Sequence, residues 1–340
     1  MPKLSLSLLP ILLALPVPAL AQGADVREAW VASDGSLRAR ASGISLPQTI
    51  AGLSLSKSGE VTNGGKGIDN YAQYLSEDGA VQATLYVYLP SYADASIAAY
   101  MTDRAVTDRF GPKTRRTAYE SVPLQGKGGR AIRAVYDDAA DGALTTAAAF
   151  AQAGRWLVKL RVTGPSERRK EVLAGLDGML GSLHFDDAAA VRPVFPVRFA
   201  DCPAGDDRDA QLTASLPAAG ADVRAVRGVA RSFCIRGQVQ TSEGSYDVLA
   251  QQGASGGSVI VPIDDAGTVL AFDPAADGKG YQLSIHSVGE TKLYGVYDRV
   301  PSFGQIAKIL DGKDPQTAQA RTTAAYAANG EVIVRQGAAN

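Results

Sequence analysis

Short runs in which apolar and polar residues alternate, separated by glycine-containing turns, limit the fold of this chain more than any other feature. Alternation places successive side chains on opposite faces of a strand. Residues 80–89 are the clearest case, with one face formed by Val81, Ala83, Leu85 and Val87 and the other by Gln82, Thr84, Tyr86 and Tyr88. Asp78-Gly79 predicts a hairpin turn to residues 68–76, and Asp34-Gly35 predicts one between residues 28–33 and 36–41.

Two helices are expected in the same part of the chain. The first is predicted over residues 93–110, where Ile97, Tyr100, Met101 and Ala105 recur at helical spacing and should form its buried stripe. Four strands follow, over residues 114–122, 130–137, 144–152 and 155–163, and a second helix starts near Ser166. Strands, helix, strands and helix in this order predict an α+β domain over residues 25–187, with an antiparallel sheet on which helices pack.

The last strand and helix of this domain form a pattern of their own. A strand from Trp156 to Pro165 precedes a helix, and Leu180-Gly-Ser-Leu-His-Phe185 ends it. This pattern resembles the end of domains with the PsbP-like fold, although Leu183 and His184 here separate Ser182 from Phe185. The resemblance covers about residues 45–187. It implies an α/β/α sandwich and a binding or assembly role, and that family has no fixed catalytic residues to transfer.

The second half predicts a different, β-rich domain. Residues 188–196 are the expected linker, because they contain two prolines after an alanine run. In the domain that follows, over residues 197–340, strands are expected at 245–251, 258–263, 268–272, 281–287 and 291–299. Ser302 and Gln305 fit a capping box for a C-terminal helix. Asp314-Pro315 predicts a second helix that ends near Asn329-Gly330, before a last strand at 331–335.

The first residues predict an exported protein. Lys3 precedes an apolar run over residues 4–15, and Ala19-Leu20-Ala21 is typical of a signal-peptidase site. We therefore expect residues 1–21 to be a signal peptide that is cleaved after Ala21, and a mature chain in the periplasm or outside the cell. The alternative is an uncleaved apolar anchor. No later run reaches the roughly 18 apolar residues of a spanning helix.

Export makes a disulfide possible for the two cysteines. Cys202 and Cys234 are the only pair in the sequence, and an oxidising compartment permits their bond. We expect a structural bridge, and two separate thiols are the alternative. A redox role is not expected, because the sequence has no Cys-x-x-Cys motif.

Charge and composition exclude several classes of function. The chain has 34 basic and 35 acidic residues, a net charge of -1, which gives no field that would attract nucleic acid. Two histidines and two cysteines are too few for most metal centres that use these ligands. We therefore predict no metal, no cofactor and no nucleic-acid partner.

One motif suggests catalysis. Residues 253–257, Gly-Ala-Ser-Gly-Gly, match the nucleophile elbow of serine hydrolases, and His286 follows at the required place in chain order. An elbow needs a helix after the serine, whereas residues 258–263 predict a strand. A glycine-rich hairpin loop explains the motif without chemistry, but Ser255 and His286 remain the one pair worth testing as a hydrolase.

Aromatic residues suggest binding instead. Six of the 13 tyrosines lie between residues 71 and 100, and Tyr86, Tyr88 and Thr84 share one strand face. If that face is open, it suits a protein partner or a sugar; if helices cover it, these tyrosines belong to the core. We expect an exported, non-catalytic binding or assembly protein whose partner is an unknown protein or envelope component. A serine hydrolase and a structural cell-envelope protein are the alternatives.

Overall fold

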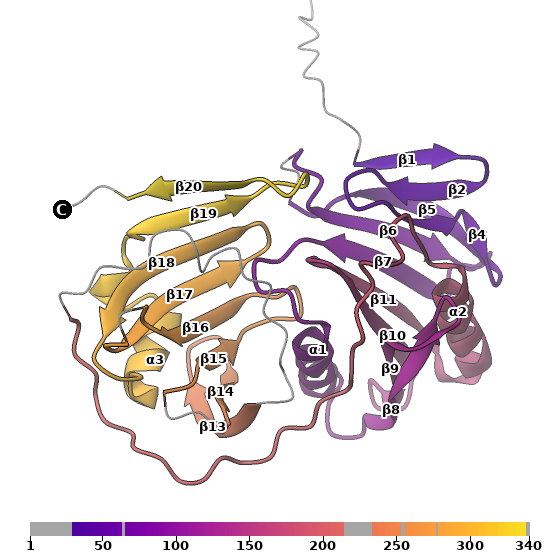
Figure 1. Cartoon of the computed structure of the whole chain (residues 1–340). Coiled ribbons are helices and arrows are strands. Elements are labelled where there is room, and N and C mark those ends of the chain that lie inside the picture. Colours follow the sequence, from indigo (N-terminus) through magenta and orange to yellow (C-terminus); the bar gives the residue numbers. More distant parts are fainter. Residues whose placement is uncertain (1–28, 63–64, 214–232, 253–255, 277, 338–340) are drawn as a thin grey trace, which may run out of the picture.

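A computed structural model describes residues 29–62, 65–213, 233–252, 256–276 and 278–337 of the chain. Within these residues the fold consists of two eight-stranded antiparallel sheets and one four-stranded sheet, with three α-helices (Figure 1). Antiparallel pairing, packed helices and a β-rich C-terminal part confirm the predicted α+β class. The signal-peptide prediction for residues 1–21 lies outside the described residues.

The first sheet is continuous across the N-terminal unit, which we define as residues 29–187. Its strands in spatial order are β4 (Thr49–Ile50), β5 (Leu53–Glu60), β6 (Asp69–Leu75), β7 (Gln82–Tyr88), β11 (Trp156–Pro165), β10 (Leu144–Ala153), β9 (Lys127–Ala139) and β8 (Arg115–Leu124). The two predicted hairpins are confirmed, since β6 pairs with β7 and β1 (Trp30–Ser33) with β2 (Ser36–Ala39).

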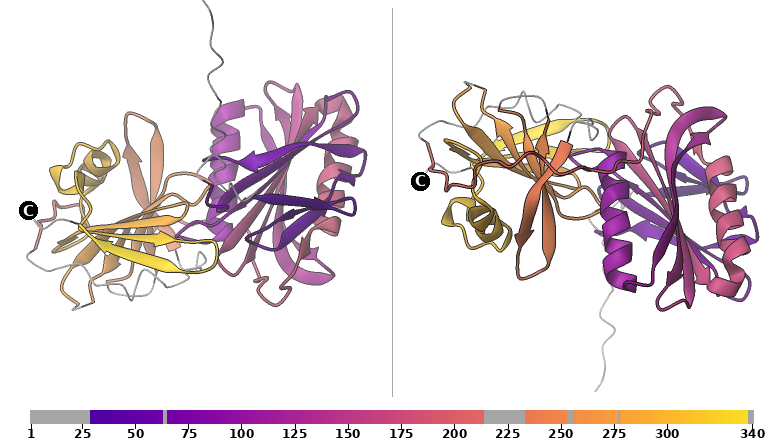
Figure 2. Two further views of the ribbon diagram at one scale, coloured as in Figure 1. Left: turned by 90° about the horizontal axis from the view of Figure 1, so that it is seen from above. Right: turned by 90° about the horizontal axis from the view of Figure 1, so that it is seen from below.

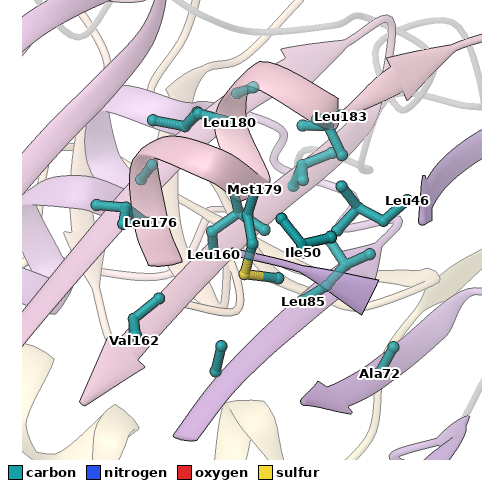
Figure 3. Packing of buried hydrophobic residues seen from close by; sticks show 14 of the residues in the cluster. Leu46, Ile50, Ala72, Leu85, Leu160, Val162, Leu176, Met179, Leu180 and Leu183 are labelled. Carbon is teal, nitrogen blue, oxygen red and sulfur yellow. The ribbon is translucent and has the colours of Figure 1, made fainter. Parts of the chain in front are cut away.

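One face of this sheet is covered by α2 (Arg169–Ser182) and by the four-stranded sheet. Leu176 and Met179 of α2 pack against Leu160 and Val162 of β11 (Figure 3). The small sheet adds β3 (Ile44–Pro47) and β12 (His184–Phe185) to β1 and β2, and it contributes Trp30, Leu37, Ile44 and Leu46 to the same core. The sequence analysis missed β3 and β5, although Leu53-Ser-Leu55 carries the alternation that marks a strand.

The second sheet forms a meander in which each strand pairs with the next along the chain. Its strands are β13 (Phe233–Gln240), β14 (Ser245–Gln251), β15 (Val259–Pro262), β16 (Val269–Pro274), β17 (Tyr281–Ser287), β18 (Glu290–Tyr297), β19 (Thr322–Tyr326) and β20 (Val332–Gln336). Against one face lies α3 (Phe303–Leu310), through Ile306 and Ile309. Ser302 and Gln305 form the predicted capping box of this helix.

The helix α1 (Ala95–Phe110) lies between the two large sheets (Figures 1 and 2). Ala95, Ala98 and Ala99 pack on the first sheet. On its opposite side Ile97 packs with Val269 and Ala271 of the second sheet, and Tyr100 and Met101 extend that cluster. The layers therefore follow the order α3, second sheet, α1, first sheet, α2.

This arrangement corrects the predicted buried stripe of α1. Small residues face the helix's own sheet, whereas Ile97, Tyr100 and Met101 face the C-terminal unit, which we define as residues 188–337. Ala105, which the spacing assigned to the stripe, is exposed. A helix buried on two sides carries apolar residues around most of its circumference, so no single stripe identifies its own sheet.

The predicted second C-terminal helix is also corrected. After Asp314, which caps through its side chain as expected, the chain forms only a 3-10 turn over Pro315–Thr317. Residues Thr322–Tyr326 instead form β19, which pairs with β18 and buries alternate residues. Threonine and tyrosine favour a half-buried strand, and the pairing partner lies far away in sequence.

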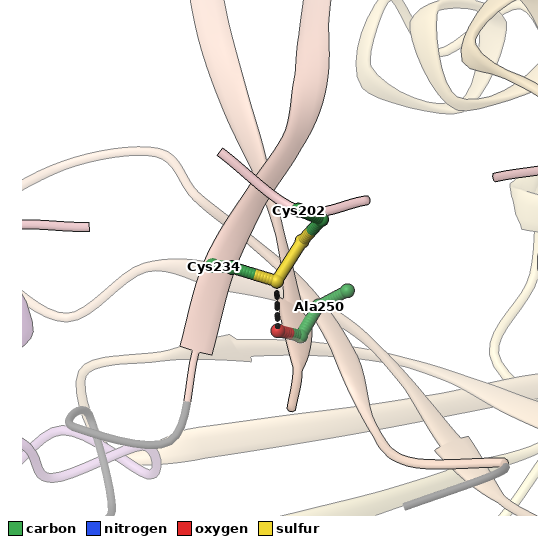
Figure 4. The surroundings of a disulfide bond; sticks show 3 residues. All are labelled: Cys202, Cys234 and Ala250. Carbon is green, nitrogen blue, oxygen red and sulfur yellow. Dashed lines mark hydrogen bonds between the residues drawn. A yellow bond between two sulfur atoms is a disulfide. The ribbon is translucent and has the colours of Figure 1, made fainter. Parts of the chain in front are cut away.

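The segment between the two sheets runs along both units. The backbone N–H of Val194 donates a hydrogen bond to the Gly129 carbonyl of the N-terminal unit, and Val197 joins the cluster between α1 and the second sheet. Farther on, Cys202 and Cys234 form a disulfide with their Cα atoms 5.1 Å apart, which confirms the predicted bridge (Figure 4). The bridge fixes this segment to the edge strand β13.

A search of the described residues for helices with the length and hydropathy needed to cross a bilayer finds none.

Candidate functional site

A buried polar contact joins the two units at Asp265, in the turn between β15 and β16. The Thr102 hydroxyl of α1 donates to its carboxylate at 2.6 Å, and Lys159 of β11 forms an ion pair with it. The Tyr88 hydroxyl donates to the Asp265 carbonyl at 2.7 Å. Three elements of the N-terminal unit thus bind one loop of the C-terminal unit.

Electrostatics keep this carboxylate charged. Burial by itself raises the pKa of Asp265, but the charge and hydrogen bond of Lys159 and the bond from Thr102 outweigh it. The net result is a pKa below the ordinary value of an aspartate. Lys159 is 8 % exposed, so the pair lies mostly out of water.

A second polar contact lies farther along α1. Tyr100 and Arg104 of the helix both bond to the Asp247 carboxylate of β14, and Gln238 of β13 donates to the same group at 2.8 Å. Burial, followed by the bond to Asp247, raises the pKa of Tyr100 well above its usual value. The phenol therefore acts as a neutral donor that holds the helix against the second sheet.

The predicted tyrosine face divides into a covered and an open part. Tyr88 is 3 % exposed and its hydroxyl is used at the Asp265 contact. Tyr86 and Thr84 lie on the same side of β7 but are only partly buried. The loop of the C-terminal unit covers one end of the face and leaves the other end accessible.

His286 of β17 lies in a buried cluster of hydroxyl groups. Its Nδ1 atom is 3.1 Å from the Ser91 hydroxyl and 3.2 Å from that of Thr291, and its Nε2 atom is 2.9 Å from the Ser284 hydroxyl. The histidine is 6 % exposed, so a substrate could not reach it without opening the junction. Ser255, its predicted partner in a hydrolase, lies outside the described residues.

A pocket of about 320 Å³ opens where the ends of the two sheets meet. Its lining comes from the β10–β11 and β19–β20 turns, the turn after β2, the end of β7 and the chain after β12. The lining residues are Ser42, Leu89, Ala153, Gly154, Arg155, Trp156, Phe185, Asp187, Ala190, Tyr326, Ala327, Ala328 and Gly330. This volume lies within the range of small-molecule sites, and such sites favour the junctions between units.

One cationic side chain, Arg155, lies beside aromatic residues in this pocket. The guanidinium carbon of Arg155 lies 4.0 Å from the centre of the Tyr326 ring, and its Nη2 atom donates to the Ser91 carbonyl at 3.3 Å. Its Nε atom is buried and has no hydrogen-bond partner among the residues that the structure describes. Because Nε is out of solvent, a ligand in the pocket would meet the charge of the guanidinium rather than this donor, and a cation beside apolar walls suits an anionic ligand with an apolar body.

The polar side chains of the lining come from a small set of residue types. Among the described residues around the pocket, Ser42 and Asp187 carry a hydroxyl and a carboxylate, and none is a histidine, cysteine or lysine. A serine nucleophile needs a base within hydrogen-bond reach. The sequence did not predict this pocket. Trp156, Phe185 and Gly330 belong to patterns that it singled out, but those patterns are far apart along the chain and only the fold brings them together.

Comparisons with known proteins identify no relative for the whole chain. No protein-family model matches the sequence, and no curated protein matches it. A search of solved structures finds the cyanobacterial PsbP protein CyanoP from Synechocystis sp. PCC 6803, at 12 % sequence identity and a TM-score of 0.32. The match covers 44 % of this chain and 91 % of CyanoP. The chain is thus similar to a PsbP protein only distantly, over less than half of its length.

Proposed function

We propose that this chain is an exported, non-catalytic binding protein whose ligand occupies the pocket between the two sheets. The ligand class is a small amphipathic molecule with an apolar body and one anionic group. The observation that carries the proposal is the position of Arg155, a cation against the Tyr326 ring, in a pocket of ligand size that Trp156 also lines. The disulfide supports export, because such bonds persist in oxidising compartments.

The proposal is tested with 1-anilinonaphthalene-8-sulfonate, a fluorescent anion with an apolar body. We expect the folded protein to bind it at one site. Ala190→Phe places a ring in the pocket and should weaken binding more than tenfold. Arg155→Leu removes the cation and should weaken it about tenfold, the effect of losing ~1.4 kcal/mol of charge-assisted bonding. Fluorescence titration at neutral pH gives the dissociation constants.

The neighbouring residue supplies the control. Ala189 is exposed and does not line the pocket, so Ala189→Phe adds the same ring without filling it. Unchanged binding in this variant assigns the dye to the pocket. Equal affinity in wild type, Ala190→Phe and Arg155→Leu would refute the site and leave the structural envelope role as the better explanation.

A further inference from the structure

The open end of the tyrosine face carries aromatic and polar side chains in register. Tyr71 of β6 lies directly opposite Tyr86 of β7, and Gln73 lies opposite Thr84. Arg161 of β11 is opposite Thr84 on the other side. Residues that are paired in this way point to the same face of a sheet, and all five are partly buried rather than enclosed.

Two arginines converge beside this face. The guanidinium carbons of Arg109 and Arg161 lie 5.5 and 5.9 Å from the centre of the Phe110 ring at the end of α1. Among the described residues, neither side chain forms a hydrogen bond or an ion pair. Burial, and then the charge of Arg109, lowers the pKa of Arg161. Two like charges held close together are stabilised when an anion binds between them.

The other charged groups near the face do not cancel this positive charge. Lys57 lies 6.0 Å from the centre of the Tyr71 ring, and Lys159 lies 5.6 Å from that of Tyr86. Asp265 is the carboxylate that acts on Arg161, and Lys159 already forms an ion pair with it. The face therefore presents cations and phenol rings together.

We propose that this open face, formed by Tyr71, Gln73, Thr84, Tyr86, Arg109 and Arg161, binds an anionic polysaccharide. Its carboxylates would pair with the two guanidiniums, and its rings and hydroxyls would contact the phenols and the Gln73 amide. The site is separate from the pocket between the sheets.

The side chains favour a sugar over a protein partner. Protein interfaces also use tyrosine and arginine as anchors, but the buried centre of such an interface is mostly apolar. In the described part of the chain, the exposed large apolar residues are Val61 and Ile333, and neither lies on β6, β7 or β11. The face instead carries amide, hydroxyl and phenol groups along two strands. Such groups can form hydrogen bonds and ring contacts with the hydroxylated rings of a polysaccharide.

The test measures binding of polygalacturonate, a polymer of carboxylated sugars, by affinity electrophoresis and by calorimetry. We expect binding that weakens as salt increases, and no retardation by the neutral polymer dextran. Arg109→Gln and Arg161→Gln should each weaken binding roughly tenfold, since each removes one charge-assisted contact. Arg109 is exposed at the helix end, so its replacement leaves the fold intact even if the variant of the half-buried Arg161 unfolds.

Arg40→Gln is the matched control, because Arg40 is an exposed arginine in the turn after β2 and should not affect binding. Wild-type affinity for polygalacturonate in Arg109→Gln would overturn the proposal, as would a lack of binding by the wild-type protein. Binding of poly-glutamate without binding of polygalacturonate would assign the face to an acidic protein instead. Dye binding in the pocket is measured separately, so failure of one site does not decide the other.

Discussion

Replacing Asp265 by Asn is expected to lower the free energy of unfolding by about 3–5 kcal/mol. The change leaves the Lys159 ammonium, which is 8 % exposed, without its counter-charge inside the junction. Removing one partner of a buried ion pair costs this much because the remaining charge stays out of water. Denaturation by urea, followed by circular dichroism, measures the loss.

Two further variants separate this effect from a general loss of charge. Glu290→Gln removes the carboxylate of a more exposed pair with Lys292 and should change stability by less than about 1 kcal/mol. The double variant Asp265→Asn with Lys159→Met removes both charges and should recover most of the loss. An Asp265→Asn protein as stable as the wild type would show that the pair does not hold the units together.

Acidification should reproduce part of the same effect. Because the folded-state pKa of Asp265 lies below its ordinary value of 3.8, the ionised group stabilises the folded state above that value. This contribution is lost as the pH falls below 3.8 and through the folded-state pKa. The difference in stability between wild type and Asp265→Asn should therefore shrink in that range.

Replacing both Cys202 and Cys234 by alanine is expected to cost ~3–4 kcal/mol. The bond joins residues 32 apart in sequence, and releasing a loop of this size increases the entropy of the unfolded chain by that amount in the loop-entropy model. The same loss should appear in the wild-type protein in the presence of a reductant, and urea denaturation with and without dithiothreitol measures it.

Reductant is also the control for this prediction. It should not change the alanine variant, which has no bond to reduce. Equal stability of the oxidised wild type and the variant would mean that the segment after residue 188 is held by its packing at Val194 and Val197 alone.

The sequence predicted the positions of α1, α2 and α3 and most strands, but it missed β3 and β5 and predicted a helix where β19 lies. Alternation in β7 and β11 and turns such as Asp78-Gly79 are local signals, and the structure confirms them. The two faces of α1 could not be assigned, because the helix packs on a second sheet that is distant in sequence. β19 was predicted as a helix for a similar reason, since its strand character depends on pairing with β18.

The sequence predicted less of the candidate sites than of the fold. The bond between Cys202 and Cys234 followed from there being one possible pair. Tyr86 and Tyr88 were predicted to share a face, but only the structure shows that a loop at Asp265 covers Tyr88. Arg155 carries no motif in the sequence, and its importance comes from its position against Tyr326.

The central claim is that α1 and the contacts at Asp265 and Asp247 join the two units into one cooperative body. Calorimetric unfolding tests this claim most directly. We expect a single transition for the wild-type protein, with equal calorimetric and van't Hoff enthalpies. When Asp265→Asn is combined with Asp247→Asn, we expect two resolved transitions or a broadened one. Two separate transitions in the wild-type protein would contradict the claim.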